Sequence, residues 1–223
     1  MENTNVMKVA LIGASGFVGS HMLRELLDRG HQVTAIVRNP DKVTVQHPNL
    51  VVEKGDVYNE AEVTALVKGL DAVISAFNPG WTNPRIYSDF LAGSRSIQQG
   101  VKKAGVKRLI VIGGAGSLEV APGVQLIDTP QFPAAYREGA SGARDYLNEL
   151  RQEQDLDWTF ISPAIEMHQG TAGIRRGTYR IALDHPVFDE NGRSVLSVED
   201  LAVATVDELE QPKHIRQRFT AAY

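Results

Sequence analysis

The chain of 223 residues contains no cysteine. This excludes a disulfide framework, a thiol nucleophile and any metal centre built on cysteine. The histidines are scattered along the chain without the spacing that metal ligands require, so we expect no metal site. Any chemistry performed by the protein must therefore depend on other groups.

Positive charge and long apolar runs are also scarce. The chain has 23 Lys and Arg against 27 Asp and Glu, and the net charge of -4 argues against nucleic acid as the main partner. No apolar run approaches the roughly 20 residues that cross a bilayer. The N-terminus carries Glu2 and no apolar segment before the first predicted strand, unlike a secretory signal. We expect a cytoplasmic protein without a membrane partner.

Short apolar runs alternate with segments of helical periodicity along most of the chain, and 43% of the residues are hydrophobic. Strands alternating with helices are typical of parallel βαβ units, so the sequence predicts an α/β fold with a Rossmann-type, doubly wound parallel sheet. The predicted strands are 8–12, 32–37, 50–53, 71–76, 106–112 and 158–161. The predicted helices are 17–29, 60–68, 86–104 and 135–153.

The pattern changes after Pro163. Residues 164–196 are rich in glycine and proline, with two short strand candidates around Tyr179 and Val187. This stretch is too small for an independent domain, and we expect a small inserted subdomain on the substrate side, over the ends of the strands. Beyond it we expect a helix with a capping box at Ser197–Asp200, ending near Leu209, and an edge strand at 217–222. The chain 1–223 is thus predicted to form a single NAD(P)-binding domain.

The clearest motif is the glycine-rich turn at residues 13–19, which reads GASGFVG and stands between the first strand and the first helix. In the dinucleotide-binding fingerprint the first glycine permits a tight turn, the second lets the backbone approach the pyrophosphate, and the third lets helix and strand pack closely. The helix N-terminus adds positive partial charge. A turn without a ligand is the alternative interpretation.

The end of the second strand distinguishes the two nicotinamide cofactors. An NAD site places Asp or Glu there to bind the ribose hydroxyls. This chain instead has Arg38, which can pair with a 2′-phosphate, and Lys42 could add charge. A solvated loop position is the alternative for Arg38. The contrast favours NADP(H), with NAD(H) as the other candidate.

Three further strand ends carry small or polar residues that could border a ligand. Asp56 follows the third strand and could accept a hydrogen bond from the adenine amino group, or could simply cap a turn. Ala76 and Phe77 follow the fourth strand. Gly113 follows the fifth, where the nicotinamide end should lie. The crevice of an open α/β sheet is expected at these positions.

Together these motifs resemble the atypical short-chain dehydrogenase/reductase family. The similarity is strongest to its NmrA-like and biliverdin-reductase-B-like group, which includes proteins of the NADH-flavin reductase type. It covers nearly the whole chain and rests on residues 13–19, 37–40, 55–57, 157–163 and 197–202. The resemblance implies a pyrophosphate turn lined by Gly13, Ser15, Gly16, Phe17 and Val18, and a 2′-phosphate contact from Arg38. It also implies that Asp56 and Val57 border the adenine, that Ala76 and Phe77 lie along the cofactor, and that Pro163 begins the segment over the nicotinamide.

One departure from the family pattern limits the chemistry. Short-chain dehydrogenases use Tyr-x-x-x-Lys, in which the Lys makes the Tyr an effective acid or base. Here Tyr136 lies in the corresponding region and is the one candidate catalytic residue, but Ala140 stands where the Lys would be. Alcohol oxidation and sugar epimerisation by the usual residues are therefore disfavoured.

Three functions remain. The first is NADP(H)-dependent reduction of a small planar acceptor, such as a flavin or quinone, because the cofactor supplies the hydride and the acceptor ring delocalises the charge. Phe77, Trp81 and the loop 116–132 could form an acceptor pocket, or could pack as core or lid. The second is a non-catalytic, NmrA-like redox sensor that binds NADP(H). The third is a sugar-nucleotide epimerase or dehydratase.

Two surface features remain open at the level of sequence. The basic segment 175–180 could hold an anionic substrate group or form a solvated hairpin face. The long helices that flank the predicted sheet could form a homodimer face.

Overall fold

The computed structural model describes residues 5–223, so Glu2 lies outside the described residues. Its main element is an eight-stranded sheet with the order β3-β2-β1-β4-β5-β8-β10-β9. The strands of this sheet are β1 (Lys8–Ile12), β2 (Gln32–Val37), β3 (Leu50–Lys54), β4 (Ala72–Ser75), β5 (Arg108–Ile112), β8 (Asp157–Ser162), β9 (Arg180–Ala182) and β10 (Gln217–Ala222).

The strand order has the topology of a doubly wound fold. From β1 the chain adds β2 and β3 on one side, then crosses to β4, β5 and β8 on the other, and all these neighbours pair in parallel. The order therefore reverses between β1 and β4, and a ligand crevice is expected outside their carboxyl ends. The predicted Rossmann-type α/β fold is confirmed.

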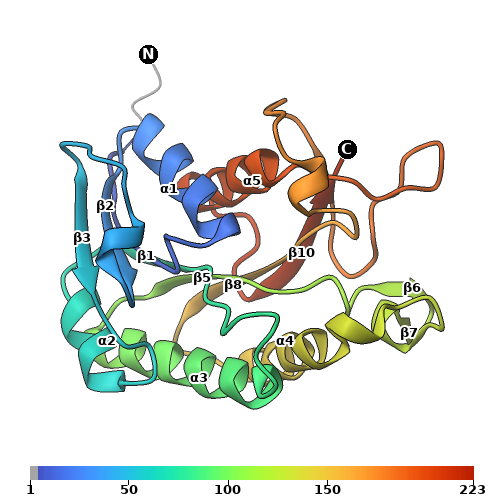
Figure 1. Cartoon of the computed structure of the whole chain (residues 1–223), viewed down its shortest axis with the longest axis horizontal. Helices are drawn as coiled ribbons and strands as arrows, with labels where there is room; N and C mark the ends of the chain where they lie inside the picture. The colour runs from blue at the N-terminus through green and yellow to red at the C-terminus, as the bar shows by residue number, and fades with distance from the viewer. Residues whose placement is uncertain (1–4) are drawn as a thin grey trace.

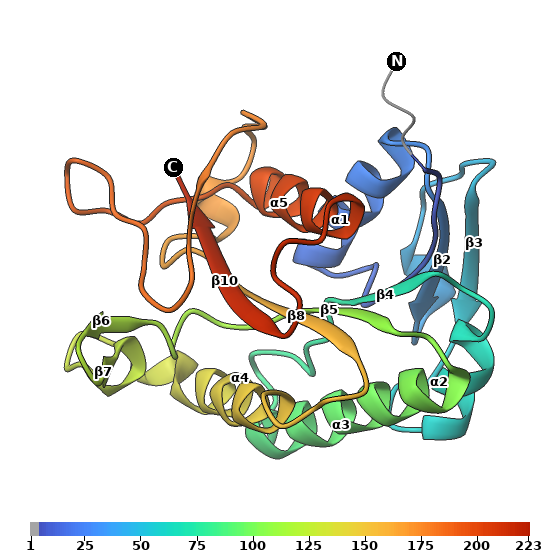
Figure 2. The same cartoon turned by 180° about the vertical axis from the view of Figure 1, so that it is seen from behind.

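Within residues 5–223, five α-helices cover the two faces of the sheet (Figure 1). They are α1 (Phe17–Asp28), α2 (Glu60–Val67), α3 (Ile86–Ala104), α4 (Arg137–Leu150) and α5 (Val198–Glu210). In both views α1 and α5 lie on one face, while α2, α3 and α4 lie on the other (Figures 1 and 2). The helix periodicity thus located each helix, with its ends shifted by a few residues.

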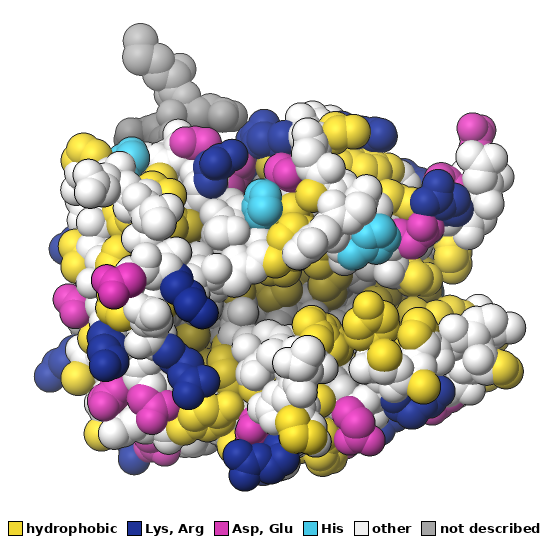
Figure 3. All heavy atoms as spheres, in the orientation of Figure 1, with side chains coloured by type: hydrophobic (Ala, Val, Ile, Leu, Met, Phe, Trp, Pro, Cys, Tyr) yellow, Lys and Arg dark blue, Asp and Glu magenta, His cyan; other side chains and the backbone are white. Residues whose placement is uncertain are grey.

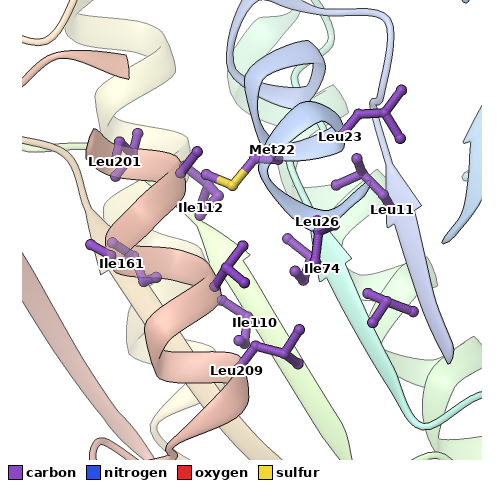
Figure 4. Close-up of a cluster of buried hydrophobic side chains, with 14 of the residues drawn as sticks. Leu11, Met22, Leu23, Leu26, Ile74, Ile110, Ile112, Ile161, Leu201 and Leu209 are labelled. Carbon is purple, nitrogen blue, oxygen red and sulfur yellow. The ribbon is translucent and has the colours of Figure 1, made fainter. Parts of the chain in front are cut away.

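Each face of the sheet has its own hydrophobic core. The core beneath α1 and α5 contains Leu26 and Leu201 from the helices and Ile74 and Ile110 from the strands (Figure 4). The core beneath α2, α3 and α4 contains Trp158 and other large side chains. Because a parallel sheet is buried on both faces, its strands read as continuous apolar runs, which is why the sequence revealed them.

The C-terminal region differs from the prediction in two respects. Strand β10 is not an edge strand, because it pairs in parallel with β8 and carries the antiparallel strand β9 on its outer side. Val187 is buried but belongs to no strand. The stretch 164–196 supplies β9 to the main sheet and pairs Glu166 with Val195 through a single bridge.

A separate two-stranded hairpin, β6 (Glu119–Ala121) and β7 (Val124–Gln125), follows β5. In both views it lies beyond the start of α4, at the same end of the molecule as the loops of 164–196 (Figures 1 and 2). Among residues 5–223, no helix has the length and apolar character needed to span a membrane.

Candidate cofactor and acceptor site

The glycine-rich turn joins β1 to α1, and two of its glycines are required by the fold itself. Gly13 has φ +80°, and a Cβ built on it would lie 2.6 Å from the carbonyl oxygen of Ala76. A Cβ on Gly19 would lie 1.9 Å from the carbonyl oxygen of Gly13. The first glycine therefore permits the turn beside β4, and the third permits close packing of α1 on that turn.

Gly16 has no such requirement within the protein. Its φ of -78° suits any residue, and a Cβ would meet nothing closer than 3.5 Å. The helix that starts after it has no side-chain cap and no acidic residue in its first turn, so its first N–H groups lack side-chain partners. The open space at Gly16 and the uncapped N-terminus fit the pyrophosphate of a dinucleotide.

The other residues predicted for the turn surround this helix N-terminus. Ser15 is exposed, and Phe17 and Val18, the first residues of α1, are half-buried. The ring of Phe17 packs edge-on against His21 at 5.5 Å, and His21 Nδ1 lies 2.8 Å from the Phe17 carbonyl oxygen. Ser15 is therefore open to solvent beside the helix N-terminus, while Phe17 contacts its own helix through His21.

A groove of about 520 Å³ lies at the ends of β2 and β3. It contains both Arg38 and Asp56, which the sequence assigned to the 2′-phosphate and to adenine. It also contains Lys54 and Leu66, which the sequence analysis missed. Lys54 is opposite Val37 in the β2–β3 register, so this second cation could have been inferred from its place beside Arg38. The groove is lined by Arg38, Lys54, Gly55, Asp56, Glu62, Ala65 and Leu66.

Hydrogen bonds fix the floor of this groove. The Asp56 N–H donates to Glu62 Oε2 at 2.8 Å, and Asp56 Oδ1 accepts from the Tyr58 N–H at 3.0 Å. The carboxylate of Asp56 thus caps a turn and remains exposed enough to accept another hydrogen bond. Burial raises the pKa of the neighbouring Tyr58, and the charge of Asp89 raises it further, so Tyr58 stays protonated at neutral pH.

Two residues predicted to border the cofactor, Val57 and Phe77, also pack against the core. Val57 is buried beneath α2. The Phe77 ring stacks on Phe90 at 6.0 Å and occupies the space where a Cβ on Gly93 would lie. Val57 therefore leaves mainly its backbone toward a ligand, while the half-buried Phe77 packs one side of its ring against the core.

The ends of β5 and β8 form the opposite end of the crevice. A Cβ on Gly113 would lie 1.8 Å from the ring of Phe160, so this glycine is required by core packing. Pro163, at the start of the segment predicted to cover the nicotinamide, is buried, and Ile165 is the first exposed apolar side chain after it. Figure 3 shows a hollow with apolar atoms on both walls, between the loops of 164–196 above and the region of α4 below.

A buried arginine that the sequence analysis missed joins the loops around this end. The guanidinium of Arg218 donates to Ser117 Oγ at 2.9 Å, to Ser162 Oγ at 3.2 Å and to Asp184 at 3.0 Å. These partners belong to the loop after β5, the end of β8 and the stretch 164–196. Arg218 lies within the last strand, where no sequence motif marks it.

The structure explains the missing lysine of the Tyr-x-x-x-Lys pair. Ala140 is 7% exposed, and a Cβ built on Gly116 would lie 3.0 Å from its methyl group. The place of a lysine side chain is therefore filled by the loop after β5. Tyr136 is half exposed at the start of α4, and Arg137 donates to the Ile127 carbonyl oxygen at 2.7 Å rather than supporting the tyrosine.

The three arginine side chains of the basic segment 175–180 all contact other parts of the protein. Arg175 forms a bidentate ion pair with Glu25, and Arg176 lies over the ring of Tyr223 at 4.0 Å. Arg180 donates to backbone carbonyl oxygens. These contacts favour a structural role over anion binding. In the part of the chain that the structure describes, no three His, Asp or Glu side chains gather as metal ligands would.

Comparisons with known proteins agree with this geometry. The model of a family described as NAD(P)H-binding matches residues 13–212, so the chain belongs to that family. Uncharacterized protein YwnB of Bacillus subtilis is 40% identical over 217 residues, covering 96% of this chain and 97% of YwnB. The relationship indicated by the sequence motifs is confirmed at this level.

Two solved structures are similar over nearly their whole length. One, named a "putative epimerase" from Bacteroides thetaiotaomicron, has a TM-score of 0.91 and 47% identity, covering 98% of each chain. The other, SP1627 from Streptococcus pneumoniae, is named a "putative NADH-flavin reductase". It has a TM-score of 0.81 and 35% identity, covering 97% of this chain and 99% of its own.

Proposed function

We propose that the protein is an NADP(H)-dependent reductase of a small planar acceptor, such as a flavin or quinone. Two features together carry the proposal. Arg38 lies at the adenosine end of the crevice, and the buried Ala140 stands where the catalytic lysine would be. Arg38 favours a 2′-phosphorylated cofactor. Ala140 disfavours the acid–base pair on which alcohol dehydrogenation depends. With NADP(H) as cofactor, we expect the protein to act in the cytoplasm.

The preference for NADP(H) is supported by the electrostatics of the groove. Arg38 and Lys54 both line it, and the end of β2 has no carboxylate in the position that binds ribose hydroxyls in NAD sites. A guanidinium can bind a phosphate through two parallel hydrogen bonds. Asp56 and Glu62 add negative charge, but Glu62 accepts from the Asp56 N–H on the α2 side.

Reduction of a planar acceptor makes few demands on the protein. The bound nicotinamide supplies a hydride, and the acceptor gains that hydride together with one proton from water. The chain must hold the two rings close together and limit the access of water. The closely packed turn at Gly13 and the loops joined by Arg218 provide a rigid frame for this alignment.

The test is oxidation of NADPH, followed by absorbance, with a panel of FMN, FAD, riboflavin and simple quinones. We expect turnover with at least one acceptor and a lower KM for NADPH than for NADH. The Arg38→Ala variant should lose that cofactor preference. Rates equal to the enzyme-free background across the whole panel would refute the reductase proposal.

A non-catalytic redox sensor is a second candidate, favoured by the absence of the catalytic lysine. This reading predicts that NADP(H) binds tightly while no acceptor is turned over. Calorimetric titration with NADPH and NADP+, beside the acceptor panel, separates the two functions. Different affinities for the two redox forms, without turnover, would support the sensor.

A sugar-nucleotide epimerase or dehydratase is the third candidate, favoured by the name of the Bacteroides neighbour. The buried Ala140 counts against it because such enzymes rely on the Tyr–Lys pair. A nucleotide-sugar that raises the melting temperature of the NADP+-loaded protein would support this candidate. No shift with a panel of such compounds would leave the reductase as the better account.

A further inference from the structure

Two aromatic side chains stand exposed at the acceptor end of the crevice. Trp81 lies in the loop between β4 and α3 and is 54% exposed, and Tyr136, at the start of α4, is 50% exposed. Their rings meet edge to face, with centroids 5.2 Å apart and an interplanar angle of 87°. Large aromatic surfaces left open to water commonly mark a binding site.

The position of Trp81 is set by a glycine of α4. A Cβ built on Gly139 would lie 2.6 Å from the indole ring and 3.0 Å from Ile86, so only glycine leaves room for the indole there. One side of Trp81 is thus seated on the helix, while more than half of its surface faces solvent. This arrangement is a fixed platform rather than a side chain that moves freely.

The platform adjoins the loop where the nicotinamide end of the cofactor is expected. The residue that follows Gly139 is Ala140, whose methyl group packs against Gly116 in the loop after β5. Two adjacent residues in the first turn of α4 therefore border Trp81 and that loop, Gly139 beside the indole and Ala140 beside Gly116. In Figure 3 the hollow with apolar walls lies above the region of α4.

We infer that Trp81 is the stacking platform for the ring of the acceptor, and that Tyr136 holds the indole at the angle that stacking needs. The inference rests on the proposed reductase function and names its acceptor as a flat conjugated ring. An indole face stacks on any such ring, whereas a saturated alcohol or sugar gains little from it. Tyr136 becomes a positioning residue instead of the catalytic residue predicted from sequence.

A flat ring of this kind could come from a flavin or from a quinone. The test is calorimetric titration of the NADP+-loaded protein with riboflavin, FMN and a naphthoquinone, because NADP+ prevents turnover during the measurement. Tighter binding of FMN than of riboflavin would show that the phosphate contributes. Comparable binding of the naphthoquinone would show that the ring alone suffices.

Three variants make the measurement specific. We expect Trp81→Ala to weaken binding of the ring compounds about tenfold, in line with the loss of one stacking partner. Trp81→Phe should retain most of the affinity, and Tyr136→Phe should retain the edge contact. Val51→Ala is the matched control, because Val51 is similarly exposed (55%) on the distant edge strand β3. Affinity for NADP+ should be unchanged in all four variants.

The outcomes separate this inference from the reductase function. Equal affinity of Trp81→Ala and the unmodified protein for every ring compound would overturn the inference, as would failure of the unmodified protein to bind any of them. Turnover that is insensitive to Trp81→Ala would overturn the inference and leave the reductase intact. Ring binding that depends on Trp81, without any NADPH oxidation, would support the platform and refute the reductase.

Discussion

The guanidinium of Arg218 donates to the hydroxyl of Ser117 at 2.9 Å, across the space between β10 and the loop that follows β5. The same guanidinium reaches Ser162 and Asp184, so one buried side chain connects three segments around the end of the crevice proposed for the acceptor. Burial lowers the pKa of Arg218, and Asp184 opposes this effect. The side chain stays charged, because arginine is not deprotonated in proteins.

Replacing Arg218 by Lys should therefore disturb the acceptor end more than the cofactor end. A lysine keeps the charge but cannot reproduce the planar fork of donors. We expect the free energy of unfolding to fall by about 1–3 kcal/mol from unsatisfied buried partners. In steady-state kinetics the KM for the acceptor should rise while the KM for NADPH stays constant.

Arg151→Lys is the matched control, because Arg151 approaches the same Asp184 from the surface at 3.4 Å. Replacing Arg151 should change neither the free energy of unfolding nor the KM for the acceptor appreciably, since exposed ion pairs contribute little to stability. An equal rise in both KM values for the Arg218 variant would contradict the positioning role.

The glycines of the turn should respond differently to the same substitution. Gly19→Ala places a methyl group 1.9 Å from the Gly13 carbonyl oxygen. We therefore expect the free energy of unfolding to fall by about 1–3 kcal/mol. Gly16→Ala should leave the melting temperature nearly unchanged, because its backbone conformation suits alanine and its surroundings are open. It should nevertheless weaken NADPH binding strongly, measured by calorimetry. Unchanged binding by Gly16→Ala would argue against a pyrophosphate at this position.

Arg38 should determine the discrimination between the two nicotinamide cofactors. Loss of hydrogen bonds to a charged 2′-phosphate costs about 1.5–3 kcal/mol, so Arg38→Ala should weaken NADPH binding about 10- to 150-fold. NADH binding should change little. Lys42→Ala is the control, because Lys42 is exposed but does not line the groove. An equal loss for both cofactors in Arg38→Ala would refute the 2′-phosphate contact.

The fold was accessible from the sequence because its signals are local. Buried parallel strands read as apolar runs, helices show their periodicity, and Gly30 and Gly105 mark helix ends in the sequence. The last strand was misplaced for a nonlocal reason. Whether 217–222 lies at an edge depends on the pairing of β9 with β10, which brings together residues far apart in the chain.

The site was only partly accessible for the same reason. The glycine turn and Arg38 are marked by their place next to strands, and the structure puts Arg38 and Asp56 in one groove. Trp81 was a candidate for the acceptor pocket from the sequence, but Gly139 and Arg218 have no motif, because their contacts depend on tertiary neighbours. The side chain of Phe77 turned toward the core because a neighbouring glycine, Gly93, leaves room for its ring.

The Ala140→Lys variant tests whether the loop after β5 leaves room for a lysine side chain at position 140. Because Ala140 packs against Gly116, the longer side chain should lower stability by about 1–3 kcal/mol through overpacking. It should not create alcohol dehydrogenase activity. Glu138→Lys introduces the same residue at an exposed position of the same helix and should be tolerated. A stable Ala140→Lys protein that oxidises alcohols would contradict this prediction. It would show that the loop after β5 can move to make room for the lysine side chain.

Glu153 should make the stability depend on acid pH. Burial would raise its pKa, but hydrogen bonds from Gln98, the Asp155 N–H and Lys102 outweigh burial and lower the pKa from 4.5 to about 2. A carboxyl with a lowered pKa stabilises the fold above its unfolded pKa, and this contribution is lost as the pH falls through the folded value.

The difference in unfolding free energy between the unmodified protein and Glu153→Gln should therefore be about 3 kcal/mol at pH 7. It should decline from about pH 5 and be mostly lost by about pH 2, as measured by urea unfolding at a series of pH values. The exposed Glu190 supplies the control, since Glu190→Gln should show a small difference at every pH. A difference for Glu153→Gln that stays constant between pH 7 and pH 3 would mean that its packing, and not its charge, stabilises the contact between α3 and the end of α4.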